Sequence, residues 1–108
     1  MTVNELLKSG VLNAAVLPEG DREITGVYIG DLLSWVMGRA SSGDAWITIM
    51  SNVNILAVAA LADCACIILA EGVKLEAEIL KTAEEKGINV LYFDESIYEA
   101  AVYLNELL

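Results

Sequence analysis

A long apolar run, from Ile47 to Ala70, is the feature that most constrains the fold. It holds 24 residues, and Asp63 is the only charged one. A membrane-spanning helix is disfavoured, because Asp63 lies in the interior, a serine and two asparagines lie near the start, and the composition changes at Asp63 from Ala- and Leu-rich to β-branched. We therefore expect a buried strand, a buried helix and a second buried strand.

Apolar strands alternate with helices from residue 45 onward. We expect strands at 45–50, 66–70 and 88–93 and helices at about 54–61, 74–86 and from 97 onward. Strands that are apolar on both faces lie in parallel sheets covered by helices on both sides. The sequence thus predicts an α/β fold: a single domain over residues 1–108 with a mostly parallel sheet, helices on both faces and a C-terminal βαβαβα order.

The first half is predicted to extend this sheet. Thr2 and Glu5 have the spacing of a capping box for a short helix at about 3–9. Strands are expected at 11–17 and 22–30, and Asp31 can cap a helix at 32–40. The order and direction of these two strands do not follow from the sequence.

Composition limits the partners of the chain. Sixteen acids against six bases give a formal charge of −10, and the bases are scattered, so nucleic acid and anionic membranes are poor partners. The apolar content of 56% leaves surface to cover, which favours a homodimer or a protein partner. The N-terminal residues lack the pattern of a signal peptide, so a cytoplasmic location is expected.

The polar stretch Ser51–Asn54 lies where an apolar strand changes to a helix. Ligands of open parallel sheets bind beyond the C-terminal ends of the strands, near a change of strand order. Two interpretations stay open: Ser51 or Asn52 only caps the helix, or the free N–H groups of the capped helix also hold a ligand or a partner. The candidate ligand-binding residues are Ser51, Asn52, Asn54, Glu71, Gly72, Gly30 and Asp31.

No catalytic residues, metal ligands or cofactor are predicted. The sequence has no His, no P-loop and no G-x-S-x-G motif. Glu71, Asp94 and Glu95 lie on the expected ligand-binding edge with only Lys74 beside them, which weakens phosphate binding. We read these acids as solvated loop residues and caps; the alternatives are a small enzyme that uses Glu71 and Asp94, and an assembly scaffold without a ligand.

Other notable residues have structural interpretations. Cys64 and Cys66 are expected to be buried reduced thiols, with a redox or metal role as the alternative. Gly26 and Gly30 are read as strand glycines that permit a bulge or a close backbone approach. The aromatic residues Tyr28, Trp35 and Trp46 are expected in the core or as dimer anchors.

The segment from Ile24 to Tyr103 resembles the DRTGG domain family. The resemblance rests on AWITIMSNVNILAVAALADCACIILAEGVKLEAEILKTAEEKGINVLYF and on the preceding VYIGDLLSWVM: strand, polar turn, Ala-rich helix, strand, Gly turn, and the helix ending AEEKGI. The family comprises small α/β modules that occur alone or fused to CBS domains, inorganic pyrophosphatases and phosphotransacetylases.

The sequence departs from the residues that give the family its name. Ser51-Asn52 stands where the family has Asp-Arg, and Ala70-Glu71-Gly72 stands where it has Thr-Gly-Gly. The resemblance implies a non-catalytic regulatory or dimerising module. We expect a homodimer that binds a small ligand or a partner protein at the C-terminal edge of its sheet.

Overall fold

The long apolar run is divided among three elements in the computed structural model, which describes residues 1–108. Strand β3 (Asp44–Thr48) leads into helix α3 (Asn54–Ala62), and strand β4 (Cys66–Leu69) follows. Asp63 ends α3 in a left-handed conformation with φ of 59°. None of the helices has both the length and the apolar character that crossing a bilayer requires.

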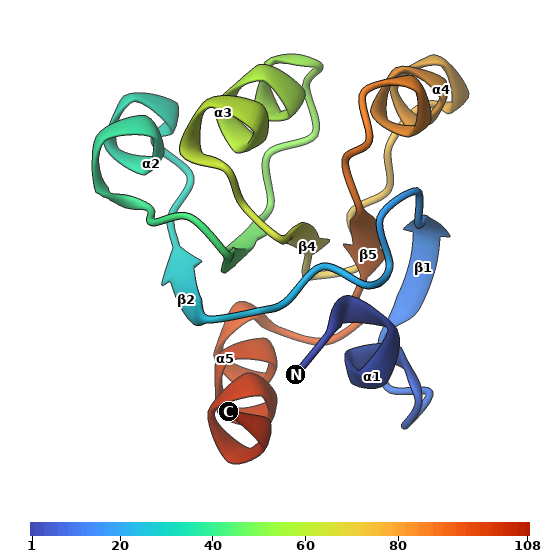
Figure 1. Ribbon diagram of the computed structural model, residues 1–108, viewed down its shortest axis with the longest axis vertical. Helices are drawn as coiled ribbons and strands as arrows, with labels where there is room; N and C mark the ends of the chain where they lie inside the picture. Colours follow the sequence, from blue (N-terminus) through green and yellow to red (C-terminus); the bar gives the residue numbers. More distant parts are fainter.

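The remaining elements complete a sheet of five strands between two layers of helices (Figure 1). Helices α2, α3 and α4 cover one face, and α1 and α5 cover the other. The bounds are α1 Val3–Leu7, β1 Asn13–Val16, β2 Gly26–Ile29, α2 Leu33–Arg39, α4 Ala77–Glu85, β5 Val90–Tyr92 and α5 Ile97–Leu107. The predicted α/β fold is therefore confirmed.

The strand order is β1-β5-β4-β3-β2. Strands β2 to β5 are parallel and follow one another in chain order, whereas β1 pairs antiparallel with β5. Right-handed crossovers between strands that advance in one direction all lie on the same face, which explains the single layer of α2, α3 and α4. The two strands of the first half thus extend the sheet at opposite edges.

The buried strands supply the core on both faces of the sheet. In β3, Ala45 and Ile47 face α1 and α5, and Trp46 faces α2 and α3. Trp46 is fully buried, and its Nε1–H donates to the Gly30 carbonyl at 2.9 Å. This bond fixes the end of β2 against β3, so the edge strand is held in place by the core.

Two predicted boundaries were wrong by about one helical turn or less. Helix α4 begins at Ala77 rather than near residue 74, although Leu75 is buried below it. Helix α2 begins at Leu33, and Leu32 stands at the N-cap without a side-chain bond. The predicted capping box of Thr2 and Glu5 is present, and both of its hydrogen bonds form.

Candidate functional site

The connections after the four parallel strands meet at one edge of the sheet. We call this edge the rim and define it by residues 30–31 after β2, 49–54 after β3, 71–72 after β4 and 94–96 after β5. All seven predicted ligand-binding residues lie on it. Their common location follows from the parallel register, because the C-terminal ends of parallel strands point the same way.

Asp31 holds the β2 part of the rim to β3. Its Oδ1 accepts hydrogen bonds from the Thr48 hydroxyl at 2.7 Å and from the Ile49 backbone N–H at 3.0 Å. The prediction that Asp31 caps α2 was wrong. Its carboxylate points across the sheet, because β3 ends beside it with an unpaired backbone N–H.

Hydrogen bonds within the chain engage the backbone N–H groups of residues 54–56, where the Ser51–Asn54 turn leads into α3. Asn52 Oδ1 accepts from the Asn54 N–H at 2.9 Å, and the Asn52 carbonyl accepts from the Ile55 N–H at 3.3 Å. The Leu56 N–H donates to the carbonyl of Val53, which is the N-cap residue. The first turn of α3 therefore has few free N–H groups for a ligand.

Ser51 and Asn54 differ from Asn52 in having no side-chain partner in the protein. Both residues are exposed, and neither hydroxyl nor amide enters a hydrogen bond. A neutral hydroxyl and a neutral amide on a fixed turn can donate to and accept from a polar ligand. Asn52 therefore stabilises the turn, whereas the side chains of Ser51 and Asn54 are available to a ligand.

The β4 and β5 connections diverge at the rim, since one leads to α4 and the other to α5 on the opposite face (Figure 1). Glu71 closes this divergence: its N–H donates to the Glu95 carbonyl at 2.7 Å, and its Oε2 accepts from the Ile97 N–H at 2.9 Å. Glu71 has φ of 61°, and Gly72 follows with φ of 73°. An anionic ligand at the start of α5 would have to displace the carboxylate of Glu71.

The one basic side chain of this region is already paired. Lys74 Nζ lies 3.0 Å from Asp94 Oδ1 and 4.3 Å from the centre of the Tyr92 ring. Tyr92 in turn accepts a hydrogen bond at its hydroxyl from the Leu75 N–H. With Asp31, Glu71, Asp94 and Glu95 around one paired lysine, the rim favours neutral or cationic groups over a bare phosphate.

The two acids considered for catalysis have separate structural partners. Glu71 bonds to the start of α5, and Asp94 pairs with Lys74. No three or more His, Cys, Asp or Glu side chains converge in a way that could hold a metal ion. Each of the two acids is therefore engaged by a partner within the chain itself.

The two cysteines are free thiols at the opposite end of β4. Cys66 is buried as predicted, and burial raises the pKa of its thiol to about 12. Cys64 is only partly buried, which corrects the expectation of two buried thiols; burial and, to a lesser degree, the Asp44 carboxylate raise its pKa to about 11. Thiols with raised pKa values are poor nucleophiles near neutral pH.

The cavity of the structure lies away from the rim, between β2 and α5. This groove has a volume of about 600 Å³ and is lined by nine residues, seven of them hydrophobic. Val27 and Ile29 of β2 and Val102 and Leu108 of α5 form its apolar walls. One feature of the sequence indicated this groove: Val27 and Ile29 alternate in a strand without charges. Nothing in the sequence indicated that α5 lies beside this strand.

Gly26 at the start of β2 and Gly30 directly after its end allow close packing rather than a bulge. A Cβ at Gly26 would lie 2.6 Å from Asp44 Oδ1, and one at Gly30 would lie 3.0 Å from the Tyr28 ring. Trp46 and Tyr28 pack in the core as predicted, whereas Trp35 is 52% exposed. Trp35 stays a predicted dimer anchor.

A protein-family model matches residues 2–107, and it describes the DRTGG domain. The chain belongs to the DRTGG domain family. No curated protein sequence matches this DRTGG domain.

Among solved structures, this DRTGG domain is similar to the CBS and DRTGG domains of the regulatory region of Clostridium perfringens pyrophosphatase, complexed with the activator diadenosine tetraphosphate. The TM-score is 0.73 at 17% sequence identity, and the match covers 95% of this chain and 45% of that chain. The chain thus spans less than half of that regulatory region. The likeness establishes the fold.

Proposed function

We propose that this DRTGG domain is a non-catalytic regulatory module that works as a homodimer and binds a small ligand or a partner protein at the rim. The observation that carries the proposal is the pair of exposed polar side chains, Ser51 and Asn54, on a turn whose backbone is otherwise fixed by Asn52. A fixed turn with available polar groups loses little conformational entropy on binding.

The charges around the rim support a neutral or cationic ligand group, or a nucleotide that arrives with a divalent cation. Lys74 is engaged with Asp94, and Glu71 occupies the start of α5. We infer that Ser51-Asn52 replaces the Asp-Arg pair and that Ala70-Glu71-Gly72 replaces Thr-Gly-Gly. This chain therefore binds a different ligand from relatives that keep the arginine.

A thermal-shift screen with nucleotides, Mg²⁺ and neutral metabolites tests the proposal. A ligand at 100 times its Kd adds about 2.7 kcal/mol to the stability, which is easily measured. Ser51→Ala and Asn54→Ala are expected to reduce the shift while they keep the fold, because neither side chain has a bond to lose. Ser34→Ala on exposed α2 is the matched control and keeps the full shift.

Two outcomes contradict the proposal. One is a screen without any shift together with empty pull-downs from the source cell. The other is a shift that survives Ser51→Ala and Asn54→Ala unchanged, because binding would then lie elsewhere.

A pure assembly scaffold is the second candidate function. The apolar groove between β2 and α5 favours it, since that surface is suited to a protein and the rim plays no part in it. The scaffold predicts a stable assembly with no ligand response.

A further inference from the structure

Thr48 is a buried polar residue whose hydroxyl the packing of the sheet does not require. It ends β3, its side chain is fully buried, and the three residues before it, Ala45, Trp46 and Ile47, are apolar. Valine has nearly the same shape and is also favoured in strands, and a buried hydroxyl costs stability unless it is hydrogen-bonded. The hydroxyl of Thr48 therefore needs an explanation other than packing.

The Thr48 hydroxyl makes two hydrogen bonds, one as donor and one as acceptor. It donates to Asp31 Oδ1 at 2.7 Å and accepts from the backbone N–H of Met50 at 3.2 Å. The same Asp31 oxygen accepts from the Ile49 N–H at 3.0 Å. A hydroxyl that donates to a carboxylate becomes a better acceptor, so the bonds strengthen one another. We call Asp31 and Thr48, joined by these bonds, the relay.

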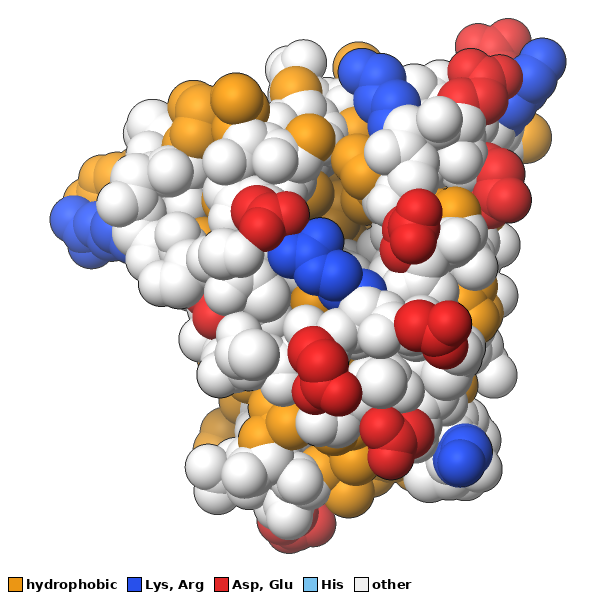
Figure 2. Space-filling view, viewed as in Figure 1, with side chains coloured by type: hydrophobic (Ala, Val, Ile, Leu, Met, Phe, Trp, Pro, Cys, Tyr) orange, Lys and Arg blue, Asp and Glu red, His pale blue; other side chains and the backbone are white.

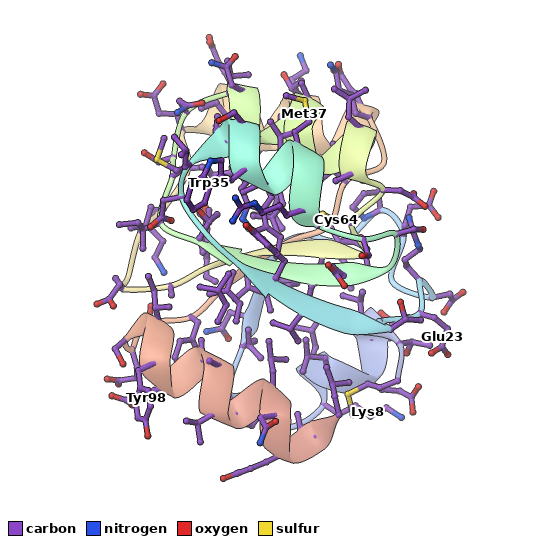
Figure 3. All side chains as sticks on the ribbon, turned by 90° about the vertical axis from the view of Figure 1, so that its left-hand side faces the viewer. Lys8, Glu23, Trp35, Met37, Cys64 and Tyr98 are labelled. Atoms are coloured by element: carbon purple, nitrogen blue, oxygen red, sulfur yellow. The ribbon has the colours of Figure 1, made fainter.

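The relay continues the bonding of β3 beyond the point where the backbone of β2 supplies it. The last backbone bond between the two strands runs from the Gly30 N–H to the Ile47 carbonyl. The Gly30 carbonyl accepts from the Trp46 ring N–H, and the chain then leaves the sheet and turns upward into α2, as Figure 3 shows. The Asp31 carboxylate thus takes the place of a strand carbonyl as the acceptor for Ile49.

The relay fixes one end of the Ser51–Asn54 turn, and Asn52 fixes the other. The relay engages the N–H groups of Ile49 and Met50, and Asn52 accepts from the first N–H groups of α3. Between these anchors, the N–H groups of residues 51–53 enter no hydrogen bond within the chain. The position of the turn therefore depends on the bonds at its two ends.

The opposite edge of the sheet is held in a different way. Because β1 and β2 lie at opposite sides of the sheet, residues 17–25 cross this edge to connect them (Figure 1). Arg22 pairs with Asp63 there at 2.9 Å, and Figure 2, which views this edge, shows basic and acidic side chains next to one another in its centre. At the rim, the only hydrogen bond that joins residues 49–53 to a residue more than four positions away comes from Asp31.

We infer that Asp31 and Thr48 are positioning residues of the rim, which hold the turn so that Ser51 and Asn54 face a ligand together. The inference rests on the proposed function for the existence of a ligand and deepens it by naming the residues that order the site. A site that is ordered before binding loses less conformational entropy when the ligand arrives, and it therefore binds more tightly.

Backbone amide relaxation, measured by NMR without any ligand, tests the positioning role. Thr48→Val removes the hydroxyl and keeps the side-chain volume, whereas Thr48→Ser keeps the hydroxyl. The order parameters of Ser51 and Asn52 are expected to be about 0.85 in the wild type and below about 0.6 in Thr48→Val. Thr48→Ser is expected to restore the wild-type values, which a role in packing alone would not explain.

Thr25→Val is the matched control at the opposite edge of the sheet. It also removes a threonine hydroxyl that donates within the chain, to the Ser42 carbonyl at 3.2 Å, and it is expected to leave the turn ordered. If Thr48→Val does not fold, Asp31→Ala at an exposed position removes the acceptor of the relay and is expected to loosen the same residues.

ATP with Mg²⁺ is the probe for the effect on binding, followed by NMR titration. The Kd is expected to increase about tenfold in Thr48→Val, because the turn must then be ordered on binding. In Thr48→Ser and Thr25→Val the Kd is expected to stay at the wild-type value.

Three results overturn the positioning role: a turn that is already mobile in the wild type, a turn that stays ordered in both Thr48→Val and Asp31→Ala, or an unchanged Kd in a loosened Thr48→Val variant. A wild-type turn that is ordered and loosens in Thr48→Val, but does not bind ATP with Mg²⁺, supports the positioning role and counts against nucleotide binding at the rim.

Discussion

The rim and the β2 edge of the sheet differ in how their backbone groups are satisfied. At the rim, Asp31, Asn52 and Glu71 use their side chains to satisfy backbone N–H groups of the chain itself. At the β2 edge, one side of the strand has no neighbouring strand, and large apolar side chains such as Ile29, Leu32 and Trp35 are exposed. The backbone groups of the rim are thus largely satisfied by hydrogen bonds within the chain, whereas the β2 edge leaves apolar side chains exposed.

This contrast separates two kinds of interaction. A rim stabilised from within can bind only a ligand that fits the few groups left over, which makes it suited to selective recognition. An exposed apolar edge is stabilised by any partner surface that packs well against it, which makes it suited to assembly. Mutations in the two regions are therefore expected to differ in size and in their dependence on protein concentration.

The largest effect is expected from the tryptophan that fixes the β2 edge from inside. Trp46→Ala removes a fully buried ring and should lower the free energy of unfolding by about 3–5 kcal/mol in urea denaturation. Trp46→Phe should cost about 1–3 kcal/mol, because it leaves the Gly30 carbonyl without its donor.

Trp35→Ala is the matched control for the buried tryptophan, because Trp35 lies on the exposed side of α2. In the monomer its cost should be about 0.5 kcal/mol, as for other surface residues. In a homodimer anchored by Trp35, the cost should increase with protein concentration. A concentration-independent loss as large as that of Trp46→Ala would contradict the description of Trp35 as a surface residue.

A smaller effect is expected at the rim from Asp31. Asp31→Ala leaves the Thr48 hydroxyl and the Ile49 N–H without their acceptor, and the expected loss is about 1–3 kcal/mol by thermal or urea unfolding. Asp31→Asn keeps an oxygen at the same position and should lose less than half as much. Equal losses for the two variants would show that charge, rather than the acceptor, holds β2 to β3.

At the rim, an effect smaller than that of Asp31 is expected from Glu71, because Glu71 is exposed and water can replace its carboxylate. Glu71→Ala removes the acceptor of the Ile97 N–H and should cost about 0.5–2 kcal/mol, the usual range for a lost helix cap. Glu71→Gln keeps the acceptor and is the control. Unchanged stability of both variants, together with unchanged hydrogen exchange at Ile97, would mean that the β4 and β5 connections are not held together by this side chain.

Local patterns were enough to predict most of the fold. The apolar strands and the residues that interrupt them, such as Asp63 and Gly72, locate β3, α3 and β4 without any long-range information. The helix starts at Thr2 and Ser96 were predictable for the same reason, since a cap and its partner lie three residues apart. Asp31 was misassigned because its bonding partners, Thr48 and Ile49, lie 17 and 18 positions away.

The location of the candidate site was predictable from the sequence, but the bonding of its side chains was not. Parallel strands necessarily bring Gly30, Ser51 and Glu71 to one edge, so the sequence was sufficient to place them there. The sequence could not tell that Glu71 reaches the start of α5, or that Lys74 pairs with Asp94. Those contacts depend on the directions in which the β4 and β5 connections leave the sheet.

By itself the sequence determined the α/β class, the buried strands and the polar edge, because hydrophobic periodicity and caps act over a few residues. Only the tertiary structure decided that β1 and β2 lie at opposite edges and that β2 borders α5. The groove between β2 and α5 exists because side chains from residues 26–29 and 101–108 meet in space. Their separation along the chain carries no local signal, and so the exposed apolar surface became visible only once the sheet was assembled.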